Sequence, residues 1–420
     1  MANHISRLLK VAGSALLLFT LSACSSAREE NTEILFTPTE SYPEPYRIPA
    51  LAQFSDGRVL ALTDYRPCKL DIGFGRVDIH GRISSRNGKK WRDEFVLIEG
   101  TGVPGALDCG FGDPALVIDR ETDEVLLMTV CGETPYPAPT TTRQNPNRVA
   151  MFRSHDKGHT WEPWVEVTEE IYTLFDDSVH GCVQSCFVTS GQIFQSRIHK
   201  VGSHYRIYIA LAARPNGNRV IYSDDFGKTW AVLGGKDALP APHGDEAKCE
   251  ELPDGSVVIS SREMGGRFFN IYRYDDVAAG TGEWGEAVYS AGRRKGCASV
   301  ENACNGGLLI LPAVRTSDFQ DVSLALHSVP LGPQRRNVGI YYKELHSGIS
   351  VDSLASDWLG PYRVSEKPSA YSTMIQLHGG NVAFYYEESD SLKTYGYDMI
   401  YKELSVARIT DGRYESSDKR

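Results

Sequence analysis

The stretch Ser154-His155-Asp156-Lys157-Gly158-His159-Thr160-Trp161 decides the fold, because the chain repeats it. A second copy reads Ser223-Asp224-Asp225-Phe226-Gly227-Lys228-Thr229-Trp230. A degenerate copy, Ser84-Ser85-Arg86-Asn87-Gly88-Lys89-Lys90-Trp91, carries arginine at the aspartate position. The central glycines of the three copies are 70 and 69 residues apart. A long fixed period indicates repeated supersecondary units rather than one continuous fold pattern.

Each part of the S-x-D-x-G-x-T-W pattern has a physical role in a tight turn. The aspartate accepts hydrogen bonds from turn amides, and the glycine supplies a positive φ. The tryptophan anchors the turn by burying a large ring. The pattern therefore predicts a hairpin turn that recurs along the chain, and it resembles the repeat known as the Asp box.

Runs rich in β-branched and aromatic residues precede and separate these copies. The runs span residues 77–84, 148–153 and 219–222 before the copies, and Val59–Leu62, Val125–Val130, Tyr205–Leu211, Ser256–Ser260 and Leu308–Leu311 between them. Only Thr168–Asp176 suggests a short helix, and we expect loops at Thr134–Asn147 and Arg315–Pro333. Many short antiparallel strands with a long repeat predict an all-β fold, a six-bladed β-propeller with Asp-box hairpins.

Composition agrees with one globular domain and excludes a class of partners. The 420 residues are 41% apolar, and the 54 acidic residues outnumber the 44 basic ones, giving a net charge of −10. A general nucleic-acid binder needs a cationic face, so we expect no nucleic-acid partner. No linker-like segment divides residues 34–420, which we expect to form the propeller and to be a monomer in solution.

The N-terminus has the pattern of a targeting segment. Arg7 and Lys10 precede the apolar run Val11–Leu21, which is too short to span a bilayer. Leu21-Ser22-Ala23-Cys24 resembles a bacterial lipobox. That resemblance implies a signal peptide at 1–23, a lipid on Cys24 and a tether at 24–33. We expect an exported protein, anchored to the outer membrane only through this lipid. A plain secretory signal is the alternative.

Eight further cysteines leave two structural possibilities open. In an exported protein they could form disulfides, or they could be small buried apolar side chains. No CxxC pair occurs, so a zinc ribbon is not expected, and Cys182 and Cys186 with His180 are a weak metal signal. We predict no metal site. The eight are Cys68, Cys109, Cys131, Cys182, Cys186, Cys249, Cys297 and Cys304.

Tyr46-Arg47-Ile48-Pro49 makes the resemblance specific. It matches the F/Y-R-I-P motif that precedes the first Asp box in bacterial exo-sialidases of glycoside hydrolase family 33. The similarity extends from Tyr46 to about Glu403. It implies a six-bladed propeller that removes terminal α-linked sialic acid from glycoproteins, glycolipids and oligosaccharides with retention of configuration. It also implies that the reaction uses no cofactor.

In that family three arginines bind the substrate carboxylate. By the motif, the first is Arg47. The second is Arg262, which follows the family-like stretch Asp245–Gly255, and the third is Arg335 in Gln334–Gly339. Arg336 is adjacent and remains an alternative to Arg335. Guanidinium groups suit this task because they are permanently charged and forked, and so can bind a carboxylate in a bidentate manner.

The resemblance assigns the nucleophile to a tyrosine and its base to a glutamate. Ala370-Tyr371-Ser372 matches the nucleophile context, and Glu246 matches the base. Most retaining glycosidases use a carboxylate nucleophile, and sialidases are an exception. The anomeric carbon of a sialoside bears a carboxylate that would repel an anion. A neutral phenol that loses its proton during attack avoids this repulsion.

The acid/base and two further substrate contacts follow from shorter matches. Asp71 lies 24 residues after Arg47 in a family-like R-P-x-x-x-D run and matches the acid/base residue, with Asp64 and Asp78 as competitors. Arg66 resembles the arginine near the 4-hydroxyl group of the sugar. Asp113, in Gly112-Asp113-Pro114, resembles the acidic residue on the N-acetyl or 4-hydroxyl side.

Three other functions stay open at this stage. A trans-sialidase would keep the same residues and differ in how it excludes water. A sialic-acid-binding lipoprotein without catalysis would not need Tyr371, Glu246 and Asp71 together. An Asp-box propeller that does not act on sugars predicts neither the three arginines nor their order.

Overall fold

The computed structural model describes residues 32–390 and 396–417. The expected signal peptide and Cys24 lie outside these residues. Thr32 and Glu33, which we assigned to the tether, instead begin strand β1 (Thr32–Phe36), where they pair with Lys402 and Tyr401. The folded domain therefore starts earlier than the sequence pattern indicated.

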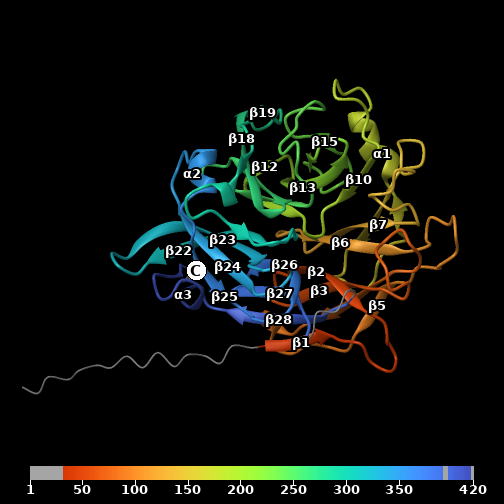
Figure 1. Cartoon of the computed structure of the whole chain (residues 1–420), viewed down its shortest axis with the longest axis horizontal. Coiled ribbons are helices and arrows are strands. Elements are labelled where there is room, and N and C mark those ends of the chain that lie inside the picture. Colours follow the sequence, from red (N-terminus) through yellow and green to blue (C-terminus); the bar gives the residue numbers. More distant parts are fainter. Residues whose placement is uncertain (1–31, 391–395, 418–420) are drawn as a thin grey trace, which may run out of the picture. The chain divides into compact units, whose positions relative to one another are not determined.

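Six sheets, here called blades 1 to 6 and antiparallel except for one short strand in blade 2, follow one another along the chain and confirm the expected propeller (Figure 1). Blade 1 contains β2 (Tyr46–Gln53), β3 (Val59–Tyr65), β4 (Asp78–Ile83) and β5 (Phe95–Ile98). Blade 2 contains β6 (Phe111–Ile118), β7 (Val125–Cys131), β8 (Arg148–Ser154) and β9 (Val165–Glu166). The short strand β11 (Gly191–Gln192) pairs in parallel with β6 of this blade. Blade 3 contains β10 (Ser185–Val188), β12 (Phe194–Val201), β13 (His204–Arg214), β14 (Asn218–Ser223) and β15 (Ala231–Val232).

The other three blades complete the ring. Blade 4 contains β16 (Ala247–Glu251), β17 (Val257–Glu263), β18 (Gly265–Asp276), β19 (Thr281–Trp284), β20 (Val288–Tyr289) and β21 (Ala298–Ser299). Blade 5 contains β22 (Leu308–Arg315), β23 (Gln320–Pro330), β24 (Val338–Leu345), β25 (Leu359–Arg363) and β29 (Tyr414–Ser416). Blade 6 contains β26 (Ser369–Gln376), β27 (Val382–Glu388), β28 (Asp398–Leu404) and β1.

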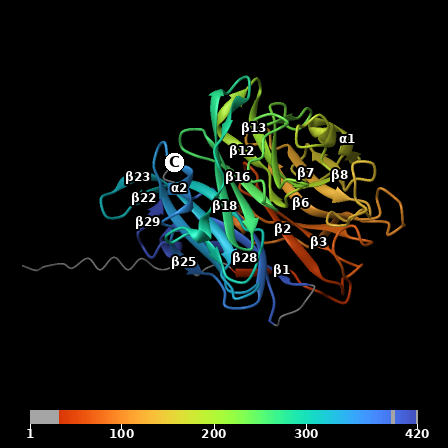
Figure 2. The ribbon, with the colours of Figure 1, turned by 45° about the horizontal axis from the view of Figure 1, so that its top comes forward.

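Both ends of the described chain are built into the last two blades. β1 supplies the outer strand of blade 6 by pairing with β28, and β29 adds to blade 5 at β22. Figure 2 shows β29 beside β22 and β1 beside β28. Strands from opposite ends of the sequence thus complete blade 6.

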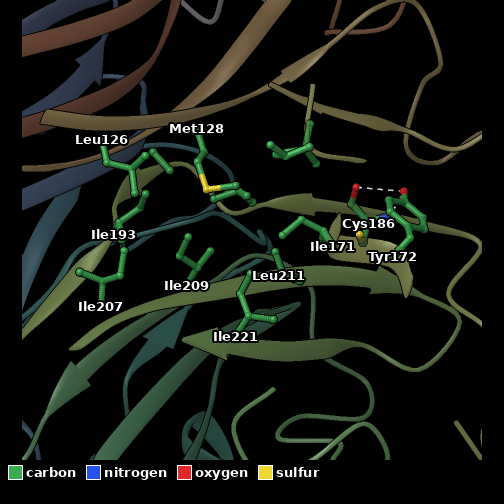
Figure 3. Close-up of a cluster of buried hydrophobic side chains, with 14 of the residues drawn as sticks. Leu126, Met128, Ile171, Tyr172, Cys186, Ile193, Ile207, Ile209, Leu211 and Ile221 are labelled. Carbon is green, nitrogen blue, oxygen red and sulfur yellow. Dashed lines mark hydrogen bonds between the residues drawn. The ribbon is translucent and has the colours of Figure 1, made fainter. Parts of the chain in front are cut away.

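One apolar cluster fills each interface between neighbouring blades. The cluster between blades 2 and 3 joins Leu126 and Met128 of β7 to Ile207, Ile209 and Leu211 of β13 (Figure 3). Corresponding clusters lie between blades 1 and 2, 3 and 4, 4 and 5, 5 and 6, and 6 and 1. Burial of both faces of each sheet explains why the strands read as nearly continuous apolar runs.

The two intact Asp boxes form the expected turns. Ser154 Oγ accepts the Gly158 N–H at 2.9 Å, and Asp156 accepts the Thr160 N–H at 2.8 Å. The copy at Asp225 repeats these contacts, and both central glycines have positive φ. In the degenerate copy, Ser85 Oγ accepts the Lys90 N–H at 3.1 Å and so replaces the missing aspartate.

Two further expectations have different outcomes. The short helix is present as α1 (Thr168–Tyr172), followed by a 3₁₀ turn at Thr173–Phe175; α2 (Val351–Ala355) and α3 (Val406–Ile409) are equally short. The loop expected at Arg315–Pro333 is wrong, because Gln320–Pro330 forms β23, an 11-residue strand. Residues 320–330 pair with β22 on one side and β24 on the other.

All eight described cysteines are free thiols, and six of them are buried. The structure thus favours the buried apolar interpretation over disulfides for these residues. Among residues 32–390 and 396–417, no cluster of histidine, cysteine or acidic side chains could hold a metal ion. No helix in this part of the chain has the length and apolar character needed to cross a membrane.

Candidate active site

Loops and strands from all six blades converge on one cavity of about 270 Å³, here called the upper cavity. Blade 3 contributes Phe187 to its wall. The eight substrate and catalytic residues predicted from the sequence all line this cavity: Arg47, Arg66, Asp71, Asp113, Glu246, Arg262, Arg335 and Tyr371. The fold thus gathers residues that are up to 324 positions apart in the chain.

Irregularities in three inner strands place site residues at the cavity. The register of β2 shifts after Arg47, where Ile48 has a φ of 62°. The register of β6 shifts after Gly112, where Asp113 has a φ of 54°, and that of β26 shifts around Tyr371. Such bulges turn a side chain away from the regular pleat and are common beside active sites. Positive φ is costly for these residue types, so the surrounding structure must hold it.

Tyr371 is the centre of a short hydrogen-bonded chain. Its hydroxyl donates to Glu246 Oε2 at 2.7 Å and accepts from Arg262 Nη1 at 3.0 Å. Arg262 also forms an ion pair with Glu246. Burial raises the pKa of Tyr371 well above its usual value, and the charge of Glu246 adds to this effect, while Arg262 opposes it. At neutral pH the phenol is therefore protonated, with a carboxylate in place to accept its proton.

Two more arginines flank the Tyr371 ring. The guanidinium carbon of Arg47 lies 5.5 Å from the ring centroid and that of Arg335 lies 5.6 Å from it. Arg336 does not line the upper cavity; it forms a backbone bridge with Pro368. Of the two adjacent arginines, the structure therefore places Arg335 at the site.

Glu387 is a functional residue that the sequence reasoning missed. Its carboxylate is fully buried and accepts from Arg47 Nε at 2.8 Å, from the Ile48 N–H at 2.7 Å and from the Tyr371 N–H at 3.0 Å. One side chain thereby fixes both irregular strand segments, in β2 and in β26. A buried carboxylate of this kind carries no sequence signal of its own.

Asp71 lies at the open side of the cavity, beside Arg66. Arg66 Nη1 contacts Asp71 Oδ1 at 2.9 Å, and the Asp71 side chain is 67% exposed. Partial burial acts to raise the pKa of Asp71, but the charges of Arg66 and Arg47 outweigh it and lower that pKa below its usual value. The free protein therefore holds Asp71 ionised.

The two competing aspartates have other partners. Asp64 is fully buried, pairs with Arg66 Nη2 at 2.8 Å and accepts the Asp113 N–H at 3.0 Å. Asp78 pairs with Arg76 and accepts the Gly100 N–H. Neither lines the upper cavity. Asp64 is a support beneath Arg66 rather than a group that faces a ligand.

Asp113 differs from Asp71 in its electrostatic setting. Burial, reinforced by the charges of Asp64 and Asp71, raises the pKa of Asp113 well above its usual value. A neutral carboxyl group at this position can donate a hydrogen bond to a ligand. The nearby wall is apolar, with Val130, Tyr136 and Phe187; Tyr136 belongs to the loop expected at Thr134–Asn147, which forms part of the cavity rather than lying wholly on the surface.

Comparisons with known proteins point in one direction. No protein-family model matches the chain. A sialidase of Micromonospora viridifaciens is 32% identical over 231 residues, which is 53% of this chain and 33% of that protein. A sialidase of Paraclostridium sordellii is 24% identical over 370 residues, covering 86% of this chain and 84% of the relative. The chain thus spans a third of the first relative and most of the second.

Solved structures show the same fold. A Hadza microbial sialidase superposes with a TM-score of 0.68 at 20% identity, over 87% of this chain and 66% of that one. The intramolecular trans-sialidase of Ruminococcus gnavus superposes with a TM-score of 0.67 at 16% identity, over 90% of this chain and 98% of that one. The curated homologues and the shared six-bladed propeller both relate this chain to sialidases.

Proposed function

We propose that this chain, a homologue of sialidases, is a retaining exo-sialidase that releases terminal α-linked sialic acid through a tyrosyl-enzyme intermediate. The observation that carries the proposal is the Tyr371 hydroxyl, held between Glu246 and Arg262 at 2.7 and 3.0 Å. A tyrosine that only packed in the core would need neither the carboxylate of Glu246 nor the guanidinium of Arg262 beside its hydroxyl group. A volume of about 270 Å³ suits one terminal sugar better than an internal stretch of glycan.

The arginines around Tyr371 would bind the substrate carboxylate. Arg47, Arg262 and Arg335 line one cavity, and each can donate more than one charge-assisted hydrogen bond. Binding there would place the anomeric carbon near the tyrosine hydroxyl. Arg66 and the protonated Asp113 would face the hydroxyl and N-acetyl groups of the sugar.

The first half of the reaction breaks the glycosidic bond. Glu246 takes the phenolic proton as Tyr371 Oη bonds to the anomeric carbon. The bond from that carbon to the aglycone oxygen breaks, and Asp71 protonates the departing oxygen. Positive charge around Tyr371 stabilises the phenolate character that develops during attack.

The second half restores the protein. Asp71, now ionised, takes a proton from a water molecule that attacks the anomeric carbon, and the bond to Tyr371 breaks. Glu246 returns its proton to the phenolate oxygen. Two displacements at one carbon give retention, so the first product is the α-anomer. The exposure of Asp71 gives it access to water.

The experiment that tests the proposal uses sialyllactose and the variant Tyr371→Phe. The wild-type chain should release free sialic acid, seen first as the α-anomer by proton NMR. The Tyr371→Phe variant should lose nearly all turnover while still binding an unsaturated sialic-acid analogue. A β-anomer as first product would exclude the double displacement. Transfer to added lactose instead of release would identify a trans-sialidase, and binding without turnover a sialic-acid-binding protein.

We also propose that a lipid on Cys24 anchors an exported, monomeric enzyme to the outer membrane. The support is the lipobox-like Leu21-Ser22-Ala23-Cys24 sequence. Cys24→Ala should move the protein from the detergent phase to the aqueous phase without changing sialyllactose hydrolysis. If that variant stays with the membrane fraction, the lipid is not what holds the protein there.

A further inference from the structure

A second polar cavity, here called the lower cavity, lies at the other end of the same inner strands. Its volume is about 230 Å³, close to that of the upper cavity. Its polar wall includes Arg120, Arg197, Glu250, Gln53, Gln192 and Gln376. None of these residues takes part in the proposed reaction.

Strand geometry places the two cavities at opposite ends of the propeller channel. β2 runs from Arg47 in the upper cavity to Gln53 in the lower one, and β26 runs from Tyr371 to Gln376. Strands of six to eight residues rise about 3.3 Å per residue, so the two sites are separate. The lower cavity is therefore not an extension of the upper one.

A buried lysine separates the two cavities. Lys248 and Glu250 alternate along β16, and Glu246 directly precedes this strand, so the two-residue spacing directs the three side chains to the same face. Glu246 lines the upper cavity and Glu250 the lower one, with Lys248 between them, 4% exposed. Gly191 leaves room for this lysine, since a Cβ there would lie 2.8 Å from Lys248 Nζ.

The lower cavity carries an excess of positive charge. Arg197 Nη2 contacts Glu250 Oε1 at 2.6 Å, which uses the one carboxylate on the wall. Arg120 Nη2 donates to the backbone carbonyl of Gln195 at 3.1 Å, and the Arg120 guanidinium carbon lies 4.7 Å from the centroid of the Tyr205 ring. Within the described part of the chain, no carboxylate forms an ion pair with Arg120. Burial, and then the charge of Arg197, lowers the pKa of Arg120.

Arg120 is also held in place before any ligand arrives. Gln195 accepts from both its backbone N–H and its guanidinium, and Gln195 in turn donates to Asp119 at 2.8 Å. Arg120 Nη1 makes no hydrogen bond within the described residues. A fixed, unneutralised guanidinium at the edge of a cavity is suited to a carboxylate.

We propose that the lower cavity binds a small sugar acid, with the carboxylate on Arg120 and Arg197 and the hydroxyl groups on the amides of Gln192 and Gln376. The similar volume of the two cavities gives room for one monosaccharide. The amides of Gln192 and Gln376 supply both donors and acceptors, which suits hydroxyl groups, whereas the Gln53 amide is bonded to Gly57, Asn87 and His378. This inference concerns a site separate from the proposed reaction and does not depend on it.

Glucuronate is a suitable probe, with glucose as its neutral counterpart. Binding to the full chain is measured by isothermal titration calorimetry and by saturation-transfer NMR. The wild-type chain should bind glucuronate and not glucose. Arg120→Gln should weaken glucuronate binding at least ~10-fold, as expected for a lost contact to a charged group, and Arg120→Lys should weaken it less. Melting temperatures check that both variants fold.

Two control variants locate the binding. Arg335→Ala alters the upper cavity and Arg294→Gln alters an exposed arginine between β20 and β21 of blade 4, and both should bind glucuronate as the wild type does. Loss of binding in Arg335→Ala but not in Arg120→Gln would assign the ligand to the upper cavity and overturn the inference. Equal binding of glucose, or no binding of glucuronate, would also overturn it. A chain that binds glucuronate in the lower cavity yet hydrolyses no sialoside would disprove only the proposed function.

Discussion

Glu387 accepts three hydrogen bonds without any contact with solvent, and these bonds hold two parts of the site together. Removing this carboxylate leaves Arg47 charged and buried without its partner, which typically costs about 3–5 kcal/mol. We expect Glu387→Ala to lower the free energy of unfolding by that order in urea titrations and to abolish sialyllactose hydrolysis. Glu387→Gln keeps an acceptor for the Ile48 N–H, so it should lose less stability and less hydrolytic activity than Glu387→Ala. Equal stability of Glu387→Ala and wild type would contradict this role.

The adjacent arginines allow a sharp comparison at the residue scale. Arg335 lines the upper cavity 5.6 Å from the Tyr371 ring, whereas Arg336 does not line it. A hydrogen bond to a charged group is worth about 1.5–3 kcal/mol. Arg335→Ala should therefore lower kcat/KM by at least ~10-fold, and Arg336→Ala should leave most of it. The opposite pattern in a steady-state assay would move the substrate carboxylate to Arg336.

Asp71 can be tested by changing the leaving group. A sugar alcohol needs a proton as its bond breaks, whereas an aryl oxide leaves without one, and general acid catalysis is worth about 10²–10⁴-fold. Asp71→Ala should lose activity on that order against sialyllactose and much less in the bond-breaking step with an aryl sialoside. Equal losses on both substrates would mean that Asp71 only maintains the shape of the cavity.

The charges around Asp71 also predict a pH effect. Arg66 and Arg47 lower the pKa of Asp71 in the free protein. A bound substrate carboxylate would neutralise part of the charge of Arg47, so the pKa of Asp71 should rise in the complex. Activity requires protonated Asp71 and falls as pH rises through that pKa. In pH profiles measured with sialyllactose, we therefore expect kcat to fall at a higher alkaline pH than kcat/KM does. If both fall at the same pH, this interpretation is wrong.

The site residues that belong to a motif could be predicted from the sequence. The residues that hold those side chains in position could not. The eight motif-matched residues gather in one cavity because their motifs fix their order and context. Glu387 and Asp64 lie under Arg47 and Arg66 and matter through geometry alone. The sequence offered Asp64 only as a competitor for the acid/base role, and it did not separate Glu387 from the other acidic residues of the chain.

At the scale of elements, the Asp boxes stabilise turns and take no part in the site. Asp225 accepts from the Thr229 N–H at 2.8 Å and from the Lys228 N–H at 3.0 Å. Asp225→Ala should lower the free energy of unfolding by about 1–2 kcal/mol, measured in urea, with unchanged kcat. Asp225→Asn keeps an acceptor and serves as its control. A large loss of kcat would show that the turn affects the upper cavity.

The same turn should make stability depend on pH in one direction. Partial burial acts to raise the pKa of Asp225, but the hydrogen bonds from Thr229 and Ser223 lower it below the usual value. This contribution is present above the pKa of aspartate in the unfolded chain, about 3.9, and is lost as pH falls through the lower folded value. The stability difference between wild type and Asp225→Ala should therefore shrink below about pH 4.

Element boundaries show where sequence patterns were insufficient. The helix at Thr168–Tyr172 and the strands around the Asp boxes follow local patterns, and they formed as expected. β23 did not, although residues 322–329 are rich in β-forming and apolar side chains, because its polar first residues, Gln320 and Asp321, read as a loop. Its pairing with both neighbours stabilises it, and such long-range partners are not encoded locally.

At the scale of the whole molecule, the ring depends on β1. Phe36 is 1% exposed and packs between blades 6 and 1, whereas Ile34 in the same strand is 58% exposed. Phe36→Ala should lower the free energy of unfolding by about 3–5 kcal/mol, and Ile34→Ala by less than about 0.5 kcal/mol. Calorimetry of both variants checks this. Similar melting temperatures for the two would show that β1 contributes little to the closed ring.

The pairing of β1 with β28 also sets an order of events during synthesis. Asp398, the first residue of β28, follows Phe36 by 362 residues. A ribosome adds about 5–20 residues per second, so the first strand made waits about 20–70 s for its partner. Throughout that interval Ile34, Leu35 and Phe36 form an apolar strand with an unpaired edge, which another nascent chain can join. The closure that stabilises the finished ring thus exposes the unfinished one to misassembly, and chaperones would be needed most while the sixth blade is still missing.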